Sequence, residues 1–104
     1  MRRRYLLLKI ESLQEIDEKD FRNAVWDAVL RLFGEYGASK TGIALIDYDV
    51  AKKYAIIRCA HTEVDMVRAS LASITEINAK PVATYVLGVS GTLKSLRRKF
   101  FSPQ

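Results

Sequence analysis

A glycine-rich turn followed by a basic cluster is the part of this sequence whose residue types suit a chemical task. Gly88 and Gly91 enclose Val89-Ser90, and glycine reaches backbone angles that other residues avoid. Successive backbone N–H groups at such a turn, ahead of a helix, form a concave site for anions. The segment therefore fits phosphate, with Ser90, Gly91 and Thr92 as candidate contacts, although a plain strand-to-helix corner is an alternative. Four cations follow without an acid among them, at Lys94, Arg97, Arg98 and Lys99.

The two ends of the chain carry its positive charge. The sequence has 104 residues and a net charge of +5. All twelve acids lie between Glu11 and Glu76, together with eight basic residues, so this middle segment is net negative. The other nine basic residues lie toward the ends and include Arg2, Arg3 and Arg4. A basic surface built from both ends would attract a polyanion, and solvated charged ends are the alternative.

No set of residues predicts a catalytic, metal or cofactor site. His61 and Cys59 are the only residues of their types, which is too few for a zinc site and leaves no intramolecular disulfide. Ser90 lies in a faint nucleophile-elbow pattern, but Thr92 replaces the second glycine and His61 precedes the serine. The lone cysteine favours a reducing, cytoplasmic setting, and no apolar run is long enough for a membrane span. We expect no catalytic residue, no metal and no cofactor.

Hydrophobic periodicity predicts one domain over residues 1–104. Strands are expected at 4–11, 41–47, 54–60 and 82–87, and helices at 17–37 and 62–78. Thr62 is expected to cap the second helix, and Asn78 to end it in a left-handed conformation. A short C-terminal helix follows, with Leu93, Leu96 and Phe100 on one side. This order predicts an α+β, ferredoxin-like or RRM-like α/β sandwich with a four-stranded antiparallel sheet. The first strand is apolar on both faces, so it is expected to be central or covered on both sides.

The first predicted helix carries two apolar stripes. Asp17 suits the N-cap, Ile16 and Phe21 suit a hydrophobic staple around it, and Gly37 suits a left-handed end. The first stripe comprises Phe21, Val25, Ala28, Val29, Leu32 and Tyr36. The second comprises Trp26, Leu30 and Phe33. A helix buried on both stripes is one interpretation, and a second stripe that faces a protein partner is the other.

The strand at 54–60 lacks the aromatic-rich signature with which RRM domains stack bases. A contact made mainly with backbone phosphates fits this sequence better.

Other segments, in this order along nearly the whole chain, resemble protein component two of archaeal ribonuclease P, a family shared with eukaryotic ribonuclease P and ribonuclease MRP. The matching segments are Arg4-Tyr5-Leu6, Leu32-Phe33-Gly34-Glu35-Tyr36-Gly37, Ile57-Arg58-Cys59, Arg68-Ala69-Ser70-Leu71, Ile74-Thr75-Glu76-Ile77 and Val86-Leu87-Gly88-Val89-Ser90-Gly91-Thr92.

The resemblance implies a non-catalytic protein subunit of a ribozyme. In that family the RNA is catalytic and removes the 5′ leader from precursor tRNA. The protein pairs with component three, a TIM-barrel-like subunit, as a heterotetramer of two plus two copies, and the pair stabilises the RNA. We therefore expect Trp26, Leu30 and Phe33 to meet the protein partner. The residues expected to meet ribonuclease P RNA or precursor tRNA are Arg2, Arg3, Arg4, Ser90, Gly91, Thr92, Lys94, Arg97, Arg98 and Lys99.

Two other functions stay open from the residues alone. One is an enzyme that acts without RNA and holds magnesium with Asp47, Asp49, Glu63 and Asp65. The other is a ferredoxin-like module that binds a small molecule or dimerises.

Overall fold

The computed structural model describes residues 2–101, and the side chains of residues 2–99. Four strands form an antiparallel sheet in the order β2-β3-β1-β6, and β4 pairs with β5 in a separate small hairpin. The predicted α+β sandwich with a short C-terminal helix is confirmed. The elements are β1 (Arg3–Glu11), α1 (Glu18–Thr41), β2 (Ala44–Asp49), β3 (Tyr54–Ala60), the 3₁₀ helix η1 (His61–Glu63), α2 (Val64–Ala72), β4 (Glu76–Ile77), β5 (Lys80–Pro81), β6 (Ala83–Ser90) and α3 (Leu93–Phe101).

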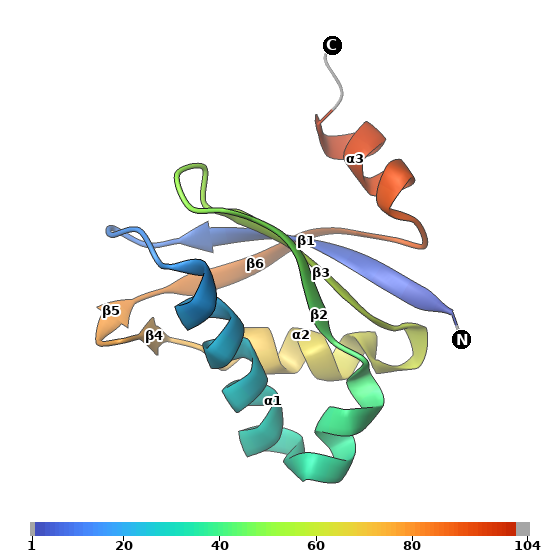
Figure 1. The fold of residues 1–104 in the computed structure, drawn as a ribbon, viewed down its shortest axis with the longest axis horizontal. Coiled ribbons are helices and arrows are strands. Elements are labelled where there is room, and N and C mark those ends of the chain that lie inside the picture. Colours follow the sequence, from blue (N-terminus) through green and yellow to red (C-terminus); the bar gives the residue numbers. More distant parts are fainter. Residues whose placement is uncertain (1, 102–104) are drawn as a thin grey trace.

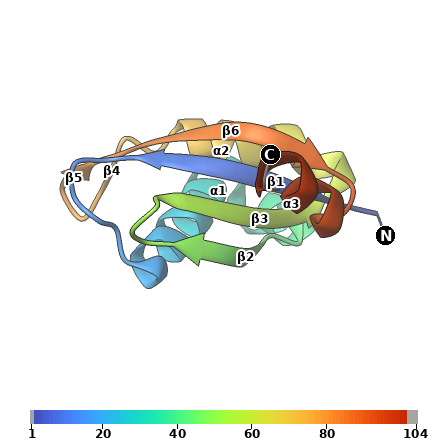
Figure 2. The ribbon, with the colours of Figure 1, turned by 90° about the horizontal axis from the view of Figure 1, so that it is seen from above.

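Helices cover both faces of the sheet. α1 and α2 lie on one face and α3 lies on the other (Figures 1 and 2). The larger core, between the sheet and the first two helices, contains Leu6, Leu8 and Phe21. A smaller core on the α3 side contains Leu7, Ile56 and Leu96, with Leu93 packed against it. The expected burial of the first strand on both faces is therefore confirmed, and the expected third apolar residue of α3, Phe100, has a side chain outside the described residues.

The central strand β1 fixes which ends of the chain meet. It pairs antiparallel with β3, where Tyr5 is opposite Arg58, and with β6, where Tyr5 is opposite Ser90. A bulge in the second pairing falls between Leu7 and Leu8. The beginning of β1 therefore lies beside the last residues of both β3 and β6.

α1 begins as predicted but ends later than predicted. The Asp17 carboxylate accepts a hydrogen bond from the backbone N–H of Lys19 at 3.1 Å, which confirms the N-cap. Gly34 interrupts the helix with φ 72° and ψ 177°, and the left-handed end is Gly42 rather than Gly37. The predicted first stripe does not stay buried to its end, although Ala38 and Thr41 beyond the kink are buried. Its last two members, Leu32 and Tyr36, are 45% and 68% exposed.

Three further corrections concern the second predicted helix, its cap and two strands. The predicted helix at 62–78 ends at Ala72, and residues 76–81 form the β4–β5 hairpin. The hairpin turns at Asn78 and Ala79, whose φ angles of 52° and 65° are those of a tight two-residue turn. Thr62 does not cap α2, because it lies within η1 and its hydroxyl meets Glu63. Two predicted strands shift, since β2 begins at Ala44 and β6 extends to Ser90.

No helix among residues 2–101 has the length and apolar character needed to cross a bilayer.

We predict that the kink in α1 requires glycine, whereas the end of the helix does not. Gly34→Asn should cost about 1–3 kcal/mol of unfolding free energy, because its φ and ψ lie where essentially only glycine is found. Gly42→Asn is the matched control and should cost less than about 1 kcal/mol, because asparagine tolerates the left-handed conformation. A Cβ added at either glycine would have no heavy atom within 4 Å apart from its chain neighbours, so crowding does not explain the difference. Urea unfolding of both variants measures the difference, and equal costs would show that the kink is not a backbone requirement.

Candidate nucleic-acid interface

The two basic ends of the chain come together at one end of the sheet. Arg3 and Arg4 open β1, and Ser90 closes β6 directly opposite Tyr5. A Cβ placed on Gly91 would lie 3.6 Å from Nη1 of Arg4. The N-terminal end of β1 and the link from β6 to α3 lie on the same side of the molecule (Figure 1). The structure thus places Arg4 close to Gly91 in the predicted turn, and the start of β1 beside the end of β6.

α3 presents its cations away from the small core that holds it. Leu96 is completely buried, whereas Lys94, Arg98 and Lys99 are exposed. Lys94 and Arg98 are four residues apart and therefore share one face of the helix. Arg97 differs, since its Nη2 lies 3.1 Å from Oδ2 of Asp47 on β2. Both partners of this ion pair are substantially exposed, so it contributes at most about 1 kcal/mol to stability.

The turn between β6 and α3 is a capped corner. Gly88 lies within β6 opposite Leu7, and neither it nor Gly91 has a positive φ, so the expected special glycine angles are absent at these two positions. The Ser90 hydroxyl accepts from the backbone N–H of Thr92 at 3.3 Å. The Thr92 hydroxyl accepts from the backbone N–H of Ser95 at 3.1 Å, which caps the helix. The plain-corner interpretation accounts for this geometry, and the positive charge around the turn comes from side chains.

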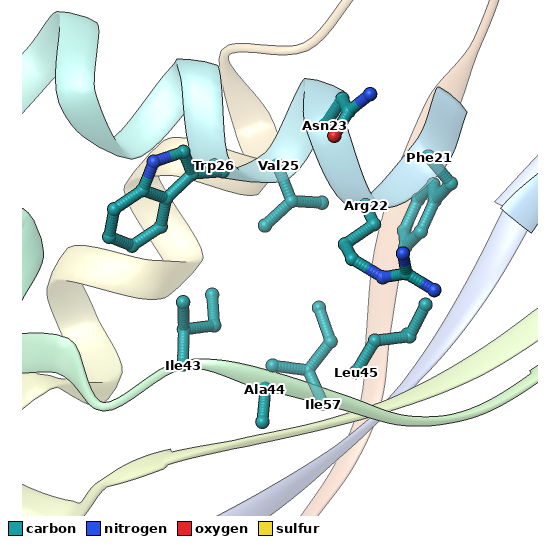
Figure 3. A pocket seen from close by; sticks show the side chains of 9 residues that line it. All are labelled: Phe21, Arg22, Asn23, Val25, Trp26, Ile43, Ala44, Leu45 and Ile57. Atoms are coloured by element: carbon teal, nitrogen blue, oxygen red, sulfur yellow. The ribbon is translucent and has the colours of Figure 1, made fainter. Parts of the chain in front are cut away.

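The second stripe of α1 is partly exposed. Trp26 is 41% exposed, Phe33 is 37% exposed, and Leu30 is partly buried. Trp26 borders a cavity of about 280 Å³ between α1 and the edge strand β2 (Figure 3). The residues that line this cavity are Phe21, Arg22, Asn23, Val25, Trp26, Ile43, Ala44, Leu45 and Ile57. The structure therefore leaves apolar surface on α1 without cover from the described residues, and Leu32 and Tyr36 extend it beyond the predicted set.

The groups considered for catalysis are not assembled. Within residues 2–101 no group of three or more His, Cys, Asp or Glu side chains is placed to hold a metal ion. Asp47 pairs with Arg97, and Asp49 accepts from the backbone N–H of Lys52 at 2.8 Å. Burial, and secondarily the charge of Glu63, raises the pKa of Cys59 to about 11, so this thiol stays protonated near neutral pH.

Sequence reasoning missed one basic residue at this end of the sheet. Arg58 belongs to the net-negative middle of the chain, yet its pairing with Tyr5 places it beside the N-terminal arginines. The signal that finds it is the antiparallel register of the strand at 54–60 against the first strand, rather than its position in the chain.

Sequence comparisons with known proteins all identify the same family. Residues 4–101 match the model of the Rpp14/Pop5 family. The chain is 39% identical to ribonuclease P protein component 2 of Pyrococcus furiosus, over 97% of this chain and 84% of that protein. It is 40% identical to ribonuclease P protein component 2 of Methanocaldococcus jannaschii, over 95% of this chain and 72% of that protein.

A solved structure shares the fold. A chain in the cryo-EM structure of yeast ribonuclease MRP matches with a TM-score of 0.72, over 88% of this chain and 75% of that chain. At 21% sequence identity, this likeness shows the architecture alone.

Proposed function

The chain belongs to the Rpp14/Pop5 family, and we propose that it is a protein subunit of ribonuclease P that binds and stabilises the catalytic RNA without an active site of its own. The observation that carries this proposal is the 39–40% identity, over nearly the whole chain, to proteins named ribonuclease P protein component 2. The RNA would then remove the 5′ leader from precursor tRNA. A small-molecule or dimerisation module is not favoured.

The arrangement of charge supports contact with RNA. Folded RNA packs phosphates that repel one another, and a basic protein surface offsets this repulsion. Arg4 lies against Gly91, and the exposed cations of α3 follow within a few residues. RNA contacts at Arg2, Arg3, Arg4, Ser90, Gly91, Thr92, Lys94, Arg97, Arg98 and Lys99 are part of our proposal. Because Asp47 already offsets Arg97, Lys94 and Arg98 are the stronger candidates on α3.

The exposed side of α1 supports contact with a protein. We propose that Trp26, Leu30 and Phe33 meet ribonuclease P protein component three, a TIM-barrel-like subunit, in an assembly of two plus two copies. Trp26 and Phe33 are large apolar residues with substantial exposure, and aromatic side chains are enriched at the centre of protein interfaces. A cytoplasmic location and an archaeal source are also part of the proposal, which follows the named relatives.

Reconstitution tests the proposed function directly. The purified chain alone should not cleave precursor tRNA at any magnesium concentration. Addition of the chain with component three to ribonuclease P RNA should lower the magnesium concentration that the RNA needs for 5′ cleavage, because protein cations replace part of the ionic screening. Cleavage by the RNA-free protein, or no effect on the RNA, would contradict the proposal.

A salt series tests the basic face of α3. The double variant Lys94→Glu with Arg98→Glu should bind ribonuclease P RNA more weakly. Loss of two phosphate contacts should also flatten the slope of log affinity against log salt by about 1.4, at about 0.7 per contact for unpaired strands. Filter binding between low and moderate salt measures both quantities.

The control for this series is the double variant Lys19→Glu with Arg68→Glu. It reverses two exposed cations on α1 and α2, which lie on the other face of the sheet from α3. It changes the net charge by the same amount, so a general loss of attraction would affect both double variants. An equal slope in the two would contradict a local RNA contact at α3.

Trp26→Ser tests the protein partner. The variant should retain its fold, because Trp26 is 41% exposed, but should weaken binding to component three by roughly tenfold or more, as for a central aromatic contact. Titration calorimetry with component three measures the binding, and circular dichroism checks the fold. Leu13→Ser is the control, because Leu13 is fully exposed outside α1. Loss of the folded state in Trp26→Ser alone would instead make Trp26 a core residue.

A further inference from the structure

Arg58 lies on an interior strand of the sheet, on the side of α3. Its neighbours along β3 define the face, since Ile57 and Cys59 belong to the larger core and Ile56 belongs to the smaller core under α3. Side chains alternate along a strand, so Arg58 shares the α3 face with Ile56. Its cross-strand neighbours are Ala44 on β2 and Tyr5 on β1.

The guanidinium of Arg58 has no partner within the described part of the chain. Its Nε is completely covered and has no hydrogen-bond acceptor. The hydrogen bonds and ion pairs formed by residues 2–99 do not include its other nitrogens. Nearly all buried polar groups in proteins are hydrogen-bonded, and a covered donor without an acceptor is unfavourable. The fold therefore gives no reason for an arginine at this position, whereas an acceptor from outside the chain would.

The charges around Arg58 select an anion as that acceptor. Arg3 lies on the same face of β1, diagonally across from Arg58, because Tyr5 is the directly opposite residue. On the other side of Tyr5 is Ser90, where the chain enters the turn to α3. Asp47, an acid on this face of the neighbouring strand β2, is paired with Arg97. Glu63 follows β3 and acts on Cys59, which faces the larger core.

We propose that Arg58 binds a phosphate group of RNA, together with Arg3, at the end of the sheet beside the start of α3. This inference rests on the proposed function, because it extends the RNA-binding surface from the chain ends onto the sheet. A guanidinium holds phosphate through two parallel N–H bonds. When the side chain turns outward to the phosphate, Nε leaves its covered position, so binding also removes the unpaired donor from the interior.

Three variants of the full chain test the site with ribonuclease P RNA as the probe. Arg58→Met keeps the length of the side chain and removes the charge. Its affinity for the RNA should fall roughly tenfold, and the salt slope should flatten by about one contact. Arg58→Lys should retain the slope and recover part of the affinity, because lysine keeps the charge but not the paired geometry. Arg68→Met is the matched control on exposed α2 and should behave as the wild type.

Thermal unfolding separates binding from a structural role. Because Arg58 has no partner among residues 2–99, Arg58→Met should be as stable as the wild type or more stable. A destabilised Arg58→Met whose salt slope is unchanged would overturn the inference and make Arg58 a structural residue. A steep salt slope for the wild type with no change in Arg58→Met would also overturn it, while leaving the proposed function intact. A wild-type chain that does not bind the RNA would instead contradict the proposed function itself.

Discussion

Antiparallel pairing of β1 between β3 and β6 is the constraint on which the rest of the molecule depends. Leu6 and Leu8 must face α1 and α2, and Leu7 must face α3. A slip of one residue would exchange these faces, so burial fixes the register of the strand. The same register fixes Arg3 and Arg4, which continue the strand beyond its apolar residues. The position of the basic N-terminus is therefore a consequence of core packing rather than of any contact made by the arginines.

The small core beneath α3 fixes the position of the C-terminal cations, just as the register of β1 fixes the position of the N-terminal arginines. Leu96 is completely buried against Leu7 and Ile56, and burial of such a side chain contributes about 1.5–3 kcal/mol. The exposed ion pair between Arg97 and Asp47 contributes less. Apolar contacts thus hold the helix, and its Lys94 and Arg98 side chains are exposed, so an anionic partner would meet them at little desolvation cost.

The sequence predicts the features that depend on local periodicity and leaves out those that depend on pairing. The alternation in β1 and the cap at Asp17 follow from neighbouring residues, and both are confirmed. Gly34 and Gly37 are both glycines of the first predicted helix, and the pattern does not predict that Gly34 takes the positive φ. Asn78 does adopt the predicted left-handed angle, but in a hairpin instead of at a helix end. Arg58 joins the basic end only through the register of β3 with β1.

Opposite faces of one sheet give this small domain two surfaces that do not compete. α3 lies on one face and α1 on the other (Figure 2). The proposed RNA contacts gather at α3 and the start of β1, whereas the exposed aromatic residues of α1 lie across the sheet. Leu32 and Tyr36, on either side of the kink at Gly34, add exposed apolar surface to α1. A partner on α1 would therefore leave α3 uncovered, so under the proposed function a chain of this size could bind a protein and an RNA on opposite faces of its sheet.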